Sequence, residues 1–330
     1  MKKFFRDIWK NKAWLLMVLP GTIWLLIFSY LPMFGQVLAF KNFKISPGGF
    51  IQSLINSEWV GFDNFKFLFN SGDAIRITRN TIVYNLIFIV LGLVAAVFVA
   101  IVLSQIANKK LGKLYQTGML FPHFLSWVIV SYFVFSFLSA DKGMLNSMLG
   151  VFGIEPIQWY SEPKYWPFIL VFMNVWKGVG YGSIVYLAAI VGIDKTYYEA
   201  ATIDGASKWQ QIKNITIPLL VPLMIVLTIM AIGGIFRSDF GLFYQVPRNS
   251  AILYPVTDVI DTYIYKGLMN MGNIGMRTAA GLYQSVVGFV LIMITNYIVK
   301  KIDPEYGLLL MERRKAKEPI IWKQKYMNQQ

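Results

Sequence analysis

The sequence alternates between long charge-free runs and short charged segments. Six runs hold at most one charged residue, and each reaches the roughly 20 residues that a helix needs to cross a bilayer core. These runs are 13–40, 81–103, 114–140, 165–193, 214–236 and 278–299, and the only charge among them is Lys177. The pattern predicts an all-α integral membrane protein with six transmembrane helices.

The first run follows the opening residues MKKFFR, which resemble the charged start of a signal peptide. Its apolar stretch is longer than the about 7–15 residues of a signal peptide, and no A-x-A cleavage site closes it. We therefore expect a retained membrane helix. Pro20 and Pro32 are expected to kink it or to end helical turns, with an irregular exit before Lys41.

Composition supports a membrane protein and argues against a soluble one. Hydrophobic residues make up 56% of the 330 residues and charged residues 15%, against about 25% charged in ordinary proteins. The mean hydropathy is +0.52. The net charge of +14 is then explained by Lys and Arg gathering in cytoplasmic segments, and no nucleic-acid partner is predicted.

The distribution of Lys and Arg predicts the orientation. With both termini cytoplasmic, 19 of the 31 basic residues fall in inside segments and 11 in outside loops. The chain then divides into a cytoplasmic start, a first helix, an outer loop, a core membrane domain and a basic cytoplasmic tail, at 1–12, 13–40, 41–80, 81–299 and 300–330. Further outer loops are expected at 141–164 and 237–277. The last is expected to expose Phe240, Phe243, Tyr244 and Tyr254 to a partner.

Little chemistry is available for catalysis. The chain has no cysteine and a single histidine, His123, and it lacks a phosphate-binding P-loop sequence. We predict no catalytic site, no metal site and no cofactor, so that any ATP must be bound by a partner. His123 follows Pro122 and is expected to satisfy a local kink, with a proton relay as the alternative.

The segment 194–218, between the fourth and fifth predicted helices, predicts two short cytoplasmic helices. Asp194 is a plausible N-cap of the first, and Gly205 supplies the left-handed position that ends it. Ser207 and Gln210 have the spacing of a capping box for the second, and Pro218 is expected to open the next membrane helix. An ordinary amphipathic hairpin would show the same local features.

The same segment resembles the EAA loop of binding-protein-dependent ABC importer permeases. The resemblance rests on Glu199-Ala200-Ala201, Gly205, Ile215 and Ile217-Pro218, where Ile217 stands in place of the commoner Leu. It extends to NT at 80–81, YLAAI at 186–190 and AAGL at 279–282. The residues DTY at 261–263 and NYIV at 296–299 are similar to the LplB-type sugar permeases of the MalF/MalG-like class. The implied fold is the type I (MetI-like) importer permease.

The resemblance implies a non-catalytic subunit of the bacterial plasma membrane that imports an oligosaccharide by alternating access. Its implied partners are a second permease in a heterodimer, two cytoplasmic ATPases and an extracellular solute-binding lipoprotein. Glu199 would pair with a basic ATPase residue, and Gly205 would turn the helix back to the membrane. The small residues suit a groove, and Tyr197, Tyr198 and Ile203 suit apolar pockets. The predicted coupling residues are Tyr197, Tyr198, Glu199, Ala200, Ala201, Asp204 and Gly205.

A substrate path is predicted between the fourth and sixth helices. Asn174, Lys177 and Tyr181 form one polar stripe at helical spacing, and Tyr283 and Gln284 lie on the sixth helix. Snorkelling of Lys177, or packing against a second permease, is the alternative for the fourth helix, as helix packing is for the sixth. The sequence G-x-G-x-G at 178–182 is interpreted as close helix approach rather than a nucleotide loop.

Other function classes are less consistent with these features. A permease for a non-sugar solute would share the EAA loop. An ion-coupled secondary transporter would need acidic relay groups inside the helices, and no Asp or Glu interrupts the six runs. An integral-membrane enzyme would need clustered His, Asp or Glu, of which the chain has few.

Overall fold

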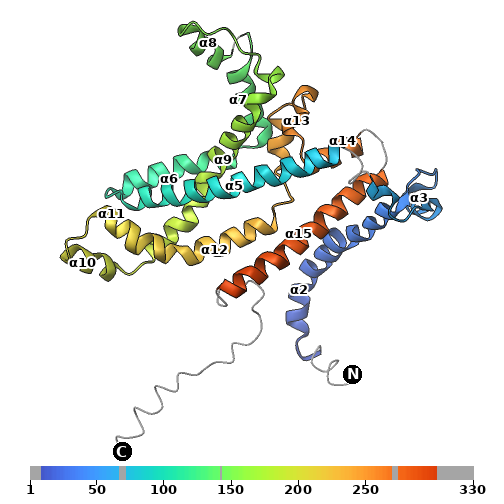
Figure 1. The fold of residues 1–330 in the computed structure, drawn as a ribbon. Helices are drawn as coiled ribbons and strands as arrows, with labels where there is room; N and C mark the ends of the chain where they lie inside the picture. The colour runs from blue at the N-terminus through green and yellow to red at the C-terminus, as the bar shows by residue number, and fades with distance from the viewer. Residues whose placement is uncertain (1–8, 67–71, 142, 270–273, 303–330) are drawn as a thin grey trace, which may run out of the picture. The chain divides into compact units, whose positions relative to one another are not determined.

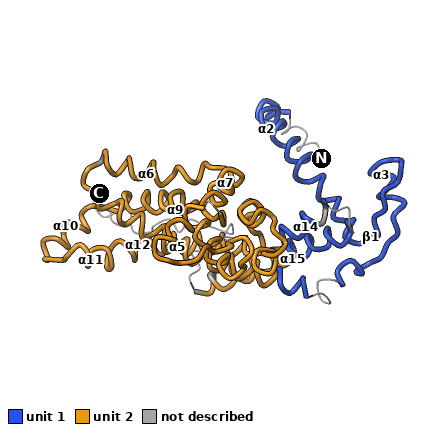
Figure 2. The backbone as a smooth tube through the Cα atoms, turned by 90° about the horizontal axis from the view of Figure 1, so that it is seen from above, with its two compact units in different colours: residues 1–77, 260–285 blue, residues 78–259, 286–330 orange. Residues whose placement is uncertain are grey.

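The computed structural model describes residues 9–66, 72–141, 143–269 and 274–302. It divides into two units, shown in Figure 2: unit 1 comprises Met1–Ile77 and Ile260–Ser285, and unit 2 comprises Thr78–Val259 and Val286–Gln330. Two long helices, α5 (Gly72–Ser104) and α15 (Ile274–Ile302), continue from one unit into the other. The predicted ends of the chain, 1–8 and 303–330, lie outside the described residues.

Unit 1 begins with one long helical stretch whose winding changes along its length. It runs from α2 (Lys12–Leu25) through a π-helical turn, η1 (Leu26–Tyr30), into the 3₁₀ segment η2 (Leu31–Phe40). Pro20 lies inside α2 and Pro32 lies at the start of η2, which places the irregular exit where the sequence predicts it. The most apolar window of this stretch has no buried residue.

The next part of unit 1 is a small folded segment in which buried polar side chains hold the backbone together. Strand β1 (Lys41–Asn42) pairs antiparallel with β2 (Glu58–Trp59), and between them lies α3 (Gly49–Asn56). The buried Lys41 donates through Nζ to the carbonyls of Leu54 (2.6 Å) and Ser57 (3.2 Å). Asn64, in η3 (Asp63–Phe65), donates to the carbonyls of Ala39 and Lys41 at 3.0 and 2.9 Å. Unit 1 also holds α14 (Ile260–Met269) and the start of α15.

Unit 2 is built around a helical bundle. In Figures 1 and 2, α5, α6 (Lys109–Phe124), α9 (Trp166–Val191) and α12 (Ile217–Gly233) run beside one another. A Cβ on Gly180 would lie 1.9 Å from the carbonyl oxygen of Met119, and a Cβ on Gly182 would lie 3.3 Å from the Cβ of Ala96. Close helix approach is therefore confirmed at Gly180 and Gly182. Gly178 has no such neighbour within 4 Å.

The charge-free pattern predicted one continuous helix for the third apolar run, but the structure has two helices there. The run forms α6 and α7 (Trp127–Leu138), which meet at an angle of 97°. Leu125 and Ser126 between them have extended backbone, and the Ser126 hydroxyl caps α7 by accepting the N–H of Ile129. Among the described residues, five helices are long and apolar enough to cross a membrane, or up to six when the bent pair is one span.

The predicted outer segment 237–277 supplies core residues, which corrects one expectation. Phe243 is 2% exposed and packs against Tyr84 and Phe88, with ring centroids 5.0 and 6.0 Å away. Phe240 and Tyr244 stack on each other and, like Tyr254, are only half-buried. Phe243 is therefore not part of an exposed surface, because the segment folds back onto α5. Unit 2 also holds the short helices α8 (Met144–Val151), η4 (Trp159–Ser161), η5 (Pro163–Tyr165), η7 (Gly241–Gln245), η8 (Ala251–Leu253) and α13 (Tyr254–Thr257).

Candidate functional site

The segment 194–218 forms two short helices, α10 (Lys195–Ile203) and α11 (Lys208–Gln211), at one end of unit 2 (Figure 1). Asp194 caps α10 by accepting the N–H of Thr196 at 3.0 Å, and this hydrogen bond holds the pKa of Asp194 below its ordinary value of 3.8. Gly205 ends the helix with a φ of +79°. Ser207 and Gln210 form the capping box of α11, with hydrogen bonds of 2.7 and 3.4 Å. The predicted caps are confirmed.

Side chains inside the loop tie its two helices together. The hydroxyls of Tyr198 and Thr216 lie 2.9 Å apart, and Thr202 donates to the carbonyl of Tyr198 at 2.7 Å. The buried Gln211 donates to the Thr202 hydroxyl at 2.9 Å. Tyr198 thus faces the second half of its own loop rather than the surroundings.

The opposite side of the loop presents apolar side chains. Tyr197, Ile203 and Trp209 are 58%, 86% and 69% exposed. Glu199, Ala200, Asp204 and Gly205 are exposed and Ala201 is half-buried. Trp209 is a further exposed residue that the sequence analysis missed, although a Trp in the otherwise polar helix KWQQ was a usable signal.

Pro218 lies in the first turn of α12, as the sequence predicts, but the continuous helical span begins earlier in the chain. Lys208–Gly233 is one candidate span that runs from α11 through a π-helical turn, η6 (Ile212–Thr216), into α12. The wide turn comes just before Pro218, which has no N–H to donate to the helix ladder. The second helix of the loop therefore continues into the membrane helix without a non-helical break.

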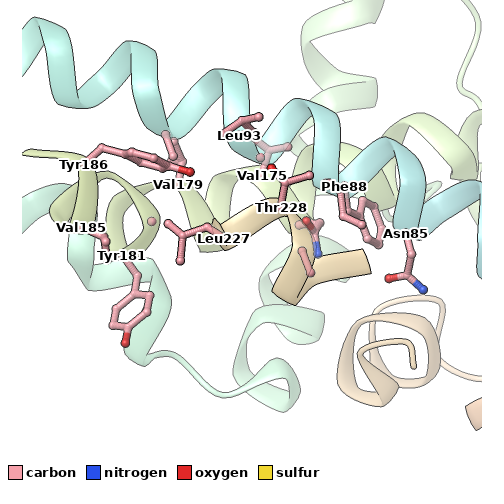
Figure 3. Close-up of a pocket in the computed structure, with 17 residues that line it drawn as sticks. Asn85, Phe88, Leu93, Val175, Val179, Tyr181, Val185, Tyr186, Leu227 and Thr228 are labelled. Carbon is pink, nitrogen blue, oxygen red and sulfur yellow. The ribbon is translucent and has the colours of Figure 1, made fainter. Parts of the chain in front are cut away.

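A pocket of about 460 Å³ lies between α5, α9 and α12 within unit 2, as Figure 3 shows. Its walls are mostly apolar, and its few polar side chains are those of Asn85, Asn174, Tyr181, Tyr186 and Thr228. Asn85 is anchored, because its amide donates to the carbonyls of Thr81 and Ile235, both at 2.9 Å. The sequence analysis missed Asn85 and Thr228, whose signal was a polar residue within each apolar run.

The predicted path residues of α9 take different places. Asn174 and Tyr181 line the pocket, and the Tyr181 ring stacks on His123 with centroids 4.5 Å apart. Lys177 instead donates to the carbonyl oxygens of His123 (2.7 Å) and Pro122 (3.4 Å) and lies 5.3 Å from the Trp127 ring. Lys177 and His123 therefore lie at the break between α6 and α7.

The other two predicted path residues lie on the part of α15 that belongs to unit 1. Gln284 is buried and donates to Asp261 at 3.1 Å, and Tyr283 is half-buried. Gln284 lines a separate pocket of about 380 Å³ within unit 1.

The chain belongs to a family of membrane transport components. Residues 88–304 match the model of the "Binding-protein-dependent transport system inner membrane component" family. The resemblance predicted from the EAA loop is thereby confirmed. The protein is an inner-membrane permease of ABC transporters that work with a binding protein, and it is not an enzyme.

Individual relatives cover nearly the whole chain. Protein LplB of Bacillus subtilis (strain 168) is 35% identical over 90% of this chain and 91% of its own. The polygalacturonan/rhamnogalacturonan transport system permease protein YteP of the same organism is 32% identical over 92% of both. A chain in the crystal structure of a bacterial ABC transporter involved in the import of the acidic polysaccharide alginate is 34% identical, with a TM-score of 0.81 over 91% of this chain and 99% of that one. The type I (MetI-like) fold is confirmed.

Proposed function

We propose that this protein is one of two permease subunits of an ATP-driven importer that moves an oligosaccharide into the cell. The supporting observation is the likeness, at 34% identity and a TM-score of 0.81, to a chain of the alginate importer. YteP, whose name specifies two polysaccharides, is 32% identical over nearly the full length. Saccharide import is therefore favoured over import of another solute.

The loop 194–218 is proposed to couple transport to two ATPases in the cytoplasm. Both termini are proposed to lie on the same, cytoplasmic side as this loop. The coupling role is supported by a pair of helices that hold each other through Tyr198, Thr202 and Gln211 while exposing Tyr197 and Ile203. Exposed apolar anchors on a preorganised element suit a groove on a partner. Glu199, beside them, can pair with a basic residue of the ATPase.

The pocket between α5, α9 and α12 is proposed to form part of the substrate path. Apolar walls with an aromatic ring and a few amide or hydroxyl groups suit the ring faces and hydroxyls of a sugar. Asn174 and Tyr181 supply such groups here. Tyr283 and Gln284 are proposed to contribute from α15, and Lys177 to shape the path through the α6–α7 break.

The test uses the whole transporter in proteoliposomes with its own second permease, ATPases and binding protein. A galacturonic acid oligosaccharide should accumulate inside only when ATP and the binding protein are both present, and the Glu199→Lys variant should assemble but not transport. Accumulation driven by a proton or sodium gradient without ATP would establish the secondary-transporter alternative. Transport restricted to solutes other than sugars would establish the non-sugar permease.

A further inference from the structure

A second pocket, within unit 1, has a chemical character unlike the apolar pocket of unit 2. It measures about 380 Å³, within the roughly 300–1,000 Å³ typical of small-molecule sites. It lies among η2, α14 and the first turns of α15. Its polar lining residues are Gln36, Asp261, Arg277, Thr278, Gln284 and Ser285.

Arg277 is unusual among the cations of unit 1. Its Nη1 nitrogen is buried and has no hydrogen-bond partner in the described part of the chain. Lys41, the buried cation of the same unit, is by contrast satisfied by two carbonyls. Arg76 also has a buried unpaired nitrogen, but its guanidinium is paired through Nη2 with Asp73 at 3.0 Å. Because a buried charged donor without an acceptor is unfavourable, Arg277 favours an anionic ligand.

We infer that the unit 1 pocket binds a carboxylate-bearing sugar of an acidic oligosaccharide, with Arg277 as the residue that recognises the carboxylate. This inference rests on the proposed function and narrows its substrate class. The planar guanidinium fork matches a carboxylate by two parallel hydrogen bonds. Thr278, Ser285 and Gln36 offer hydroxyl and amide groups for the sugar hydroxyls.

Asp261 limits what kind of anion fits. Its carboxylate accepts the Gln284 amide at 3.1 Å and lines the same pocket as Arg277. It can accept a hydrogen bond from a sugar hydroxyl, but it repels a ligand of high negative charge such as a phosphate dianion. A cation, an acid and neutral donors together suit a sugar with one carboxylate.

The test compares two sugars that differ at one group, a charged carboxylate in one and a neutral hydroxymethyl in the other. Proteoliposomes containing the complete transporter and its binding protein would take up a galacturonic acid oligosaccharide or its carboxyl-reduced, neutral counterpart. Arg277→Gln should lower the ratio of acidic to neutral uptake about ten-fold or more, because a charge-assisted hydrogen bond is lost. Arg237→Gln, which removes an exposed arginine outside the pocket, is the matched control and should leave the ratio unchanged.

Two further variants keep the test decisive if Arg277→Gln fails to assemble. Arg277→Lys keeps the charge but loses the fork, so the ratio should fall by less, and Asp261→Asn removes a repelling charge, so the ratio should rise. A ratio unchanged in all assembled pocket variants, with wild-type transport intact, would overturn this inference and leave the proposed function standing. If the wild-type transporter moves neither sugar, both this inference and the proposed function are overturned.

Discussion

Two interruptions between helices in unit 2 are held in opposite ways. The turn between α10 and α11 is secured by residues close in sequence, the Ser207–Gln210 capping box and the hydrogen bond from Gln211 to Thr202. The break between α6 and α7 has one local cap, the Ser126 hydroxyl, and its other side-chain contacts come from distant elements. Lys177 of α9 donates to carbonyls at the end of α6, and Asp239 accepts the Trp127 indole N–H at 2.6 Å.

The difference indicates how each interruption behaves. A turn that satisfies its own hydrogen bonds keeps its shape when its surroundings move, which suits a rigid coupling element. A break whose angle depends on α9 and on the segment before η7 changes with the packing of those elements. In a membrane, the carbonyls freed at such a break must find donors inside the protein, and Lys177 provides them.

The largest loss of stability is expected where α6 and α9 pack most closely. Gly180→Ala would place a Cβ 1.9 Å from the Met119 carbonyl oxygen, and this backbone atom cannot move aside as a flexible side chain can. We expect a loss of about 3 kcal/mol, at the upper end for overpacking, with disturbance of the break at the end of α6. Thermal unfolding of the purified transporter measures it. Gly178→Ala, with no neighbour within 4 Å, is the control, and equal losses in the two variants would contradict the close approach.

A smaller loss is expected when the donor at the break is removed. Lys177→Met keeps most of the unbranched side chain but leaves the carbonyls of Pro122 and His123 without this partner, and we expect a loss of about 2 kcal/mol. The same unfolding assay applies. Lys164→Met removes an exposed lysine that pairs with Glu162 and should change little. Unchanged stability of Lys177→Met would mean that the break holds without this contact.

In the coupling loop the expected effect is local. Gly205→Ala meets no neighbouring atom, so its cost of about 1–2 kcal/mol comes only from the left-handed backbone. Hydrogen exchange should increase in α10 and α11 and stay unchanged at the α6–α7 break. Faster exchange at both places would show that the two interruptions are coupled.

The smallest effect is a pH dependence at the start of α10. Because the pKa of Asp194 is lowered in the folded loop, its cap contributes stability above the unfolded pKa and loses it as pH falls through the folded pKa. Fraying of the first turn of α10 should therefore appear only under acid conditions. Asp194→Asn keeps an N-cap residue and should remove the pH dependence, as measured by the exchange of the Thr196 amide.

The same contrast explains what the sequence could predict. Caps at Asp194, Gly205 and Ser207 depend on neighbours a few residues away, so the spacing of residues was sufficient. The break at Leu125–Ser126 was missed because no local pattern links it to Lys177 and Asp239, and because its one local signal, the Ser126 N-cap, was overlooked. The single intramembrane charge did mark Lys177 as special, but its acceptors became visible only in the structure.

In the unit 2 pocket, too, the sequence predicted what depends on one helix and missed what depends on how the helices pack. Periodicity placed Asn174 and Tyr181 on one face of a helix, and both line the unit 2 pocket. The opposite wall, with Asn85, comes from α5 and depends on how the helices pack. Burial reverses the expectation for one aromatic residue, because Phe243 lies in the core, and it adds a residue that was not predicted, because Trp209 is on the surface.

The most direct measurement of the proposed coupling uses the absence of cysteine in the chain. A single cysteine at Ile203, which is 86% exposed, should crosslink to the ATPase in the assembled transporter, and a cysteine at Val151, 83% exposed at the end of α8, should not. Both are exposed apolar positions on short helices, so they differ mainly in location. A crosslink from Ile203→Cys alone is the expected result. A crosslink to the ATPase from Val151→Cys and none from Ile203→Cys would contradict both the coupling loop and the orientation.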